Sequence, residues 1–163
     1  GNGTAKLVKK EKWRDQGLGV IKDIGSHLID TIYFWFEKKF DFKLITKCKF
    51  ENKSPDHAIL ISRKKKPLIK LEMSMCRWKN YLNVEIIGSK GSLKLDSLCK
   101  WGPSTLTLYK RKLPSGLPSE KKFIIKKKDP TWELEHKFFE KFIKIKKNNL
   151  NKDLYISKVL NKL

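Results

Sequence analysis

Apolar residues recur at helical spacing after Gly19 and at strand spacing over most of the chain that follows. The apolar positions of the first segment are Val20, Ile21, Ile24, Leu28, Ile32, Trp35 and Phe36. Positions three and four residues apart place one apolar face on an α-helix. We therefore expect one long buried helix over residues 19–38, preceded by an irregular polar segment over residues 1–16.

Seven short runs rich in β-branched and aromatic residues follow this helix. They are KLITKCKFEN (43–52), HAILISRK (57–64), PLIKLEMSMC (67–76), YLNVEIIG (81–88), GSLKLD (91–96), TLTLYKRK (105–112) and KFIIKKK (122–128). Between Leu68 and Ser74 the two sides of the run alternate, which is typical of a strand with one buried face. Short Gly-, Pro-, Asn- and Ser-rich turns separate the runs, so we expect an antiparallel meander of about six strands.

Two more helices are predicted near the C-terminal end, in ELEHKFFEKFIKIKK (133–147) and DLYISKVLNKL (153–163). Helix, strands and helices in succession indicate a single α+β domain over residues 1–163. We expect an open, mainly antiparallel sheet of about six strands, packed on the long N-terminal helix and the C-terminal helices. Neither GNG nor GLGVIK completes the glycine pattern of a dinucleotide-binding turn, so this chain is not expected to bind a dinucleotide by that route.

The formal net charge of +21 raises the question of a polyanionic partner. All but four of the 38 basic residues are lysines, and they are spread over every segment. This pattern favours a solvated lysine-rich surface over a dedicated nucleic-acid site. No apolar run reaches the roughly 20 residues of a membrane helix, and residues 1–15 lack the apolar core of a secretory signal. Three widely spaced cysteines, Cys48, Cys76 and Cys99, are typical of reduced thiols in a cytoplasmic protein.

Asp23, His27 and Asp30 form a polar stripe on the first predicted helix, at spacings of four and three. Among buried apolar positions such a stripe is costly unless it lines a cavity or is fully hydrogen-bonded. A neutral imidazole can accept a proton from a substrate hydroxyl, and a carboxylate beside it can fix the tautomer or hold that hydroxyl.

Two other interpretations of the stripe stay open. An aspartate in the first turn interacts favourably with the helix dipole, and the histidine is then only a packed residue. Alternatively, Asp23 and His27 share a metal ion, for which His57, His136 and scattered acids would have to complete the ligand set.

Three segments resemble the Gfo/Idh/MocA oxidoreductases, a family named after glucose–fructose oxidoreductase, inositol dehydrogenase and a rhizopine-catabolism protein. WRDQGLGVIKDIGSHLIDTIYF resembles the family's Asp-x-x-x-His helix start after a glycine-rich bend, although Leu18 interrupts the usual triple glycine. YLNVEIIGSKGSLKLDSL resembles its strand, Gly-x-x-Gly-Ser turn and strand, and DPTWELEHKFFEKFI resembles its late helix. The resemblance covers roughly residues 4–145.

The resemblance implies the C-terminal substrate-binding domain of a protein whose N-terminal Rossmann domain, absent from this chain, binds NAD or NADP. The implied function is the catalytic half of an NAD(P)-dependent dehydrogenase that acts on a sugar or sugar-derived hydroxyl, inactive as an isolated fragment. By the motif match, His27 acts on the substrate hydroxyl while the nicotinamide takes a hydride, and Asp23 positions that hydroxyl. No cofactor or metal is expected to bind this chain alone.

Three further residues are candidates for substrate binding. Trp13 and Arg14 precede the glycine bend and would line the pocket, or would belong to a loop that packs on the sheet. Asp30 would orient His27 from one turn away, or would only form a hydrogen bond of the helix.

The alternating apolar face of the sheet predicts a homo-oligomer, since the outer sheet face of this family often packs on a second subunit. A different class of function also stays open: a stand-alone basic binding or oligomerisation module without catalysis. Asp23 and His27 discriminate between the two, because only the enzyme needs them.

Overall fold

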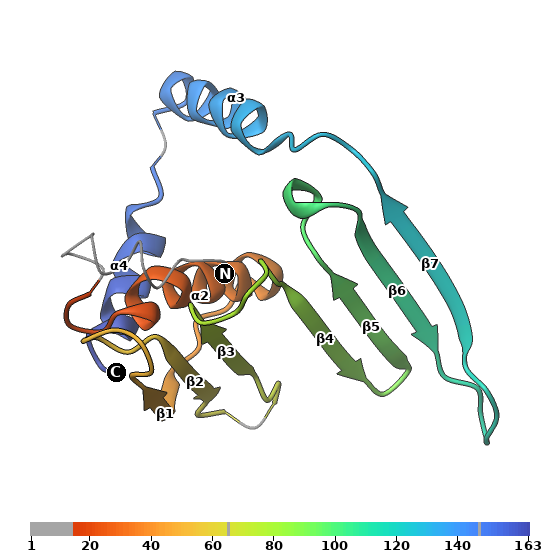
Figure 1. The fold of residues 1–163 in the computed structure, drawn as a ribbon. Coiled ribbons are helices and arrows are strands. Elements are labelled where there is room, and N and C mark those ends of the chain that lie inside the picture. Colours follow the sequence, from red (N-terminus) through yellow and green to blue (C-terminus); the bar gives the residue numbers. More distant parts are fainter. Residues whose placement is uncertain (1–14, 65, 147) are drawn as a thin grey trace. The chain divides into compact units, whose positions relative to one another are not determined.

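Each predicted run forms a helix or a strand in the computed structural model of the chain, which describes residues 15–64, 66–146 and 148–163. The helices are α2 (Val20–Phe36), the short 3-10 helix η1 (Cys99–Trp101), α3 (Thr131–Lys144) and α4 (Leu150–Leu160) (Figure 1). The strands are β1 (Phe42–Cys48), β2 (His57–Ser62), β3 (Lys70–Ser74), β4 (Asn83–Gly88), β5 (Gly91–Asp96), β6 (Ser104–Lys110) and β7 (Ser119–Ile125). The chain divides into two units, of which the second is Asn80–Lys147 and the first is the remainder.

The first unit contains an antiparallel sheet in the order β1-β2-β3. Helix α2 packs on β2 and β3, and α4 packs beside α2 (Figure 1). The predicted alternation is confirmed, because Leu71 and Met73 are buried while Lys70 and Glu72 are exposed. Gly25 lets the helix approach the sheet closely, since a Cβ there would lie 3.0 Å from the Met73 sulfur.

The glycine bend before α2 is shaped by the loop between β1 and β2. Gly17 and Gly19 have φ angles of 57° and 49°, which side chains rarely adopt. A Cβ on Gly19 would lie 2.3 Å from the Pro55 carbonyl oxygen, and that oxygen accepts the N–H of Val20 at 2.8 Å. Leu18, which lies between these two glycines, is half-buried and packs against the core.

The same loop is organised around the fully buried carboxylate of Asp56. Its two oxygens accept the backbone N–H groups of Phe50 at 2.9 Å, Glu51 at 2.6 Å and Asn52 at 3.1 Å. Three donors compensate the carboxylate for its lost hydration. The start of α2 therefore rests on a loop that a buried charge holds in shape.

Helix α4 is attached to the first unit by Tyr155. Its hydroxyl donates to the Phe40 carbonyl at 2.8 Å and accepts the Phe40 N–H at 2.9 Å. Val159, one turn later, is buried in the same core. The last helix is thus an integral part of the first unit, although 68 residues of the second unit separate it from the rest in sequence.

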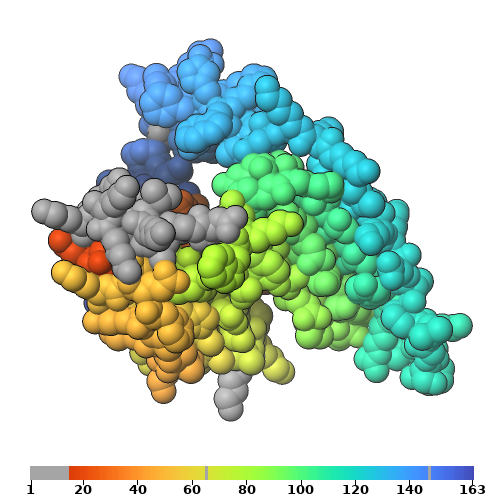
Figure 2. All heavy atoms as spheres, viewed as in Figure 1, coloured from red at the N-terminus to blue at the C-terminus, as the bar shows by residue number. Residues whose placement is uncertain are grey.

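The second unit contains an antiparallel sheet in the order β4-β5-β6-β7, with its strands side by side in Figure 1. Figure 2 shows the surface that the same residues form, in green to blue-green colours. The register gathers large apolar side chains on one face: Val84, Ile86, Leu93, Leu95, Leu106, Leu108, Phe123 and Ile125. Four of them, Ile86, Leu108, Phe123 and Ile125, are at least 39% exposed. Helix α3 begins shortly after Asp129, whose carboxylate accepts the N–H of Thr131 at 3.1 Å.

The α+β class, the open antiparallel architecture and the helices at both ends are confirmed. The strands, however, belong to two sheets, since the ladders end at β3 on one side and begin again at β4 on the other. That residues 1–163 act as one domain stays a prediction. The three cysteines are free and half-buried. Within the described part of the chain, no helix combines the length and apolar character needed to cross a bilayer.

Candidate functional site

A groove of about 890 Å³ lies in the first unit, between the N-terminal part of α2 and helix α4. On the α2 side it is lined by Lys22, Ser26 and Asp30, which lie on successive turns, and by His27. The bend before α2 contributes Leu18 to the lining. Two of the three residues of the predicted polar stripe, His27 and Asp30, therefore line a cavity, which is the condition under which polar groups on a packed helix are tolerated.

His27 and Asp30 are brought together by this groove. The His27 side chain is exposed, and its backbone carbonyl accepts the Thr31 hydroxyl at 2.8 Å. Asp30 is half-buried, and its Oδ1 lies 3.0 Å from the Lys152 Nζ of α4. The carboxylate is thus held by a cation from the opposite helix.

The other predicted site residues are placed differently. Asp23 lies in the first turn of α2, one turn before His27, and is half-buried. It is not among the described residues that line the groove, and Ser26 donates its hydroxyl to the Asp23 carbonyl at 2.8 Å. Its position near the helix N-terminus is electrostatically favourable by itself. Trp13 and Arg14 lie outside the described residues.

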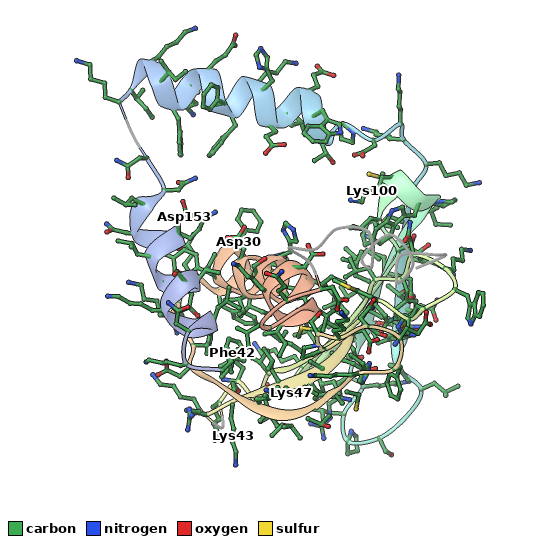
Figure 3. All side chains as sticks on the ribbon, turned by 60° about the vertical axis from the view of Figure 1, so that its left-hand side comes forward. Asp30, Phe42, Lys43, Lys47, Lys100 and Asp153 are labelled. Carbon is green, nitrogen blue, oxygen red and sulfur yellow. The ribbon has the colours of Figure 1, made fainter. Side chains whose placement is uncertain are left out.

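The second wall of the groove comes from α4, which the sequence analysis did not connect with the site. Asp153, Ser157 and Asn161 line it, together with the apolar Ile156 and Leu160. Figure 3 labels Asp30 on α2 and Asp153 on the adjacent α4. A signal was present in the sequence, because polar residues four apart form a stripe along one side of a helix.

The charges around the groove balance, unlike those of the whole chain. Lys22, Asp30 and Asp153 line it, and Lys152 pairs with Asp30 at 3.0 Å. Two cations and two anions leave no local excess among these described residues. The net charge of +21 therefore belongs to other parts of the surface.

The described residues form neither a metal site nor a Rossmann dinucleotide site. No group of three or more His, Cys, Asp or Glu side chains that could hold a metal ion is found among them. Both described sheets are antiparallel throughout, whereas a Rossmann dinucleotide site needs parallel strands joined through helices. What the groove offers chemically is an accessible imidazole surrounded by hydroxyl, amide and carboxylate groups.

One comparison with known proteins gives a match. The sequence profile of a family described as "Oxidoreductase family, C-terminal alpha/beta domain" matches residues 2–149. The match includes α2 with His27, both sheets and α3, and it ends just before α4. No curated protein and no solved structure matches the chain.

Proposed function

Because the chain belongs to the Gfo/Idh/MocA oxidoreductase family, as its C-terminal alpha/beta domain, we propose that it binds the substrate and accepts its hydroxyl proton. The family is NAD(P)-linked. The substrate we propose is a sugar or a sugar-derived compound. The observation that carries the proposal is the exposed imidazole of His27, on the wall of a groove large enough for a small molecule.

The chemistry proposed for His27 is the removal of a proton. When an alcohol is oxidised, the C–H and O–H bonds at one carbon break and a C=O bond forms. The neutral His27 imidazole takes the O–H proton through a ring nitrogen, in the pH range where histidine can act as a base. In this family the nicotinamide supplies the acceptor for the hydride.

A dinucleotide does not fit the described residues, since they contain no parallel sheet to bind it. In the proposed function it is bound by residues outside the described ones. We accordingly propose that the described residues alone, without such a site, do not turn over substrate.

The carboxylates and the residues before the bend complete the proposed site. We assign Asp23 to positioning the substrate hydroxyl and Asp30 to the groove wall, where its contact with Lys152 holds the carboxylate in place. Trp13 and Arg14 precede Gly17 and are proposed as further substrate contacts.

The proposal is tested with His27→Ala in the intact protein. Turnover is expected to fall by about a hundredfold or more, because a positioned general base contributes on the order of 10²–10⁴ in rate. The dissociation constant for the dinucleotide should stay unchanged. His136→Ala is the matched control, since His136 is exposed on α3 and pairs only with Glu140 at 3.4 Å in the structure described. Turnover that survives in His27→Ala would show that another group is the base.

We also propose a homo-oligomer formed through the apolar face of the β4-β5-β6-β7 sheet, which is the face that carries Val84, Leu95 and Leu106. The exposure of Ile86, Leu108 and Phe123 on this face supports it, because exposed apolar patches commonly mark association surfaces.

The alternative function, a basic binding module without catalysis, is supported by the lysine-rich composition. It predicts polyanion binding that weakens steeply with salt and ignores His27→Ala.

A further inference from the structure

We infer that helix α3 binds to the surface of membranes that contain anionic lipids. The helix lies flat in the headgroup layer, with its apolar side toward the hydrocarbon and its charged side toward water. The inference concerns a helix of the second unit, so it does not depend on the function proposed for His27.

The first argument is the apolar side of α3. Its large apolar side chains recur so that they share one side of the helix, here called the aromatic face of α3: Trp132, Leu134, Phe138, Phe139, Phe142 and Ile143. None of them is buried, and Phe139 and Ile143 are each 61% exposed. The Phe142 ring packs on the Phe138 ring of the same helix, at 4.2 Å between centroids. An apolar face of this kind marks a surface that binds a partner.

The second argument is the opposite side of α3, which is charged. Lys137 pairs with Glu133 one turn before it, and the His136 Nε2 lies 3.4 Å from the Glu140 Oε1. Lys141 follows Lys137 by one turn. A helix with lysines on its polar side and Trp, Phe and Leu on the other is typical of helices that lie in the plane of a membrane interface.

The third argument is the sign of the charge around the helix. Residues 126–128 are all lysines and precede α3, and Lys141, Lys144 and Lys146 lie in its last turn and just after it. Residues 126–146 contain seven lysines and four acidic residues, which gives them a net charge of +3 with His136 neutral. Lysines beside an amphipathic helix are attracted by the negative surface potential of anionic lipids. The charge therefore complements an anionic bilayer.

The fourth argument concerns the depth of binding and favours a bilayer over an apolar groove of another protein. Glu135 precedes Phe138 by three residues and Phe139 by four, so its carboxylate lies on the aromatic face. A closed apolar groove would bury this charge, which is costly without a partner. At a bilayer surface the carboxylate stays among headgroups and water. Trp132, one turn before His136, lies at the edge of the face, where an amphipathic indole suits the same layer.

The experiment measures co-sedimentation of the full 163-residue chain with unilamellar vesicles of two compositions. One is phosphatidylcholine alone, and the other contains about 30% phosphatidylserine as the anionic lipid. We expect the partition coefficient to be about tenfold or more higher for the anionic vesicles at physiological ionic strength, and to decrease as salt is added.

The deciding variant leaves the charge unchanged, because a chain with a net charge of +21 can adhere to anionic vesicles without any amphipathic helix. Phe139→Ala/Ile143→Ala removes two side chains of the aromatic face and keeps good helix formers in their place. It is expected to lower the partition coefficient for the anionic vesicles by about tenfold or more, since the transfer of apolar side chains from water is lost.

Leu113→Ala/Leu117→Ala is the matched control. Leu113 and Leu117 lie between β6 and β7, and they are 70% and 90% exposed. Their replacement deletes apolar surface away from α3 and should change the partition coefficient by less than about twofold. Circular dichroism verifies that each variant keeps the helix content of the parent.

Three outcomes would overturn the inference: no binding to the anionic vesicles, equal binding to both kinds of vesicle, or a Phe139→Ala/Ile143→Ala variant that binds like the control. Binding that Ile86→Glu abolishes and the α3 variant leaves intact would also overturn it, since the membrane contact would then lie on the sheet of the second unit.

Discussion

The buried carboxylate of Asp56 holds in shape the loop that supports the start of α2, beside the groove. Burial by itself would raise the pKa of Asp56, but the N–H donors of Phe50, Glu51 and Asn52 outweigh it, so the pKa lies below its ordinary value. A carboxyl whose pKa is lower in the folded than in the unfolded chain stabilises the fold above its unfolded pKa, near 3.9. That stability is lost as the pH falls through the folded pKa.

Replacing Asp56 by Asn is expected to lower the free energy of unfolding by about 1–3 kcal/mol at neutral pH, because one amide oxygen cannot satisfy three donors. When the pH is lowered, the free energy of unfolding should also fall less in this variant than in the parent protein. Urea unfolding at neutral pH and near pH 3, followed by circular dichroism, measures both effects. Asp41→Asn is the control, since Asp41 is an exposed carboxylate of the same unit. A variant as stable as the parent at neutral pH would contradict this role for Asp56.

Among the elements, α4 is attached to the first unit by the two buried hydrogen bonds of Tyr155. Tyr155→Phe should lower the free energy of unfolding by about 1–3 kcal/mol, because the N–H and the carbonyl of Phe40 both lose their buried partner. Thermal or urea unfolding measures the change. Tyr109→Phe deletes the same atom in the second unit and serves as the comparison. Equal effects of the two substitutions would argue against an anchor at Tyr155.

The helices also show which elements can be predicted from the sequence alone. The apolar positions of α2 recur so regularly that its bounds, Val20–Phe36, lie within one or two residues of the expected ones. Helix α4 was expected too, but its docking on α2 was not, because periodicity specifies a face and never its partner. The same limit applies to the site. The spacing in the sequence placed His27 and Asp30 on one side of α2. It could not show which residues of that side would face α4 across the groove.

For the molecule as a whole, the apolar face of the β4-β5-β6-β7 sheet is the surface that we propose for association with a second copy. We expect the chain to be at least dimeric in solution and Ile86→Glu to shift it to the monomer, because a charge is costly in an apolar interface. Ile124→Glu is the matched control: Ile124 is 54% exposed in the same sheet and lies on the other face. Analytical ultracentrifugation measures the mass of each form. A monomeric parent chain would contradict the proposed interface.

The division into two sheets is the part of the architecture that sequence patterns did not reveal. Runs such as NVEIIG and GSLKLD can be recognised as strands because each is short, contains large apolar residues at alternate positions and is bounded by turns. Which run pairs with which depends on contacts between distant residues, and alternation carries no information about them. Which strands pair with one another is therefore known only from the structure.

The position of Tyr155 in the first unit has a consequence for how the protein is made. A ribosome synthesises α2 and the first three strands early, then all of residues 80–147, and only afterwards the helix that covers α2. Throughout that interval the nascent chain carries the core residues Ile29 and Phe40 without the Tyr155 and Val159 side chains that pack with them. The second unit, with its strands paired between neighbours in sequence, can form as it emerges. The first unit therefore completes last, and until then its exposed apolar surface is a target for chaperones and proteases.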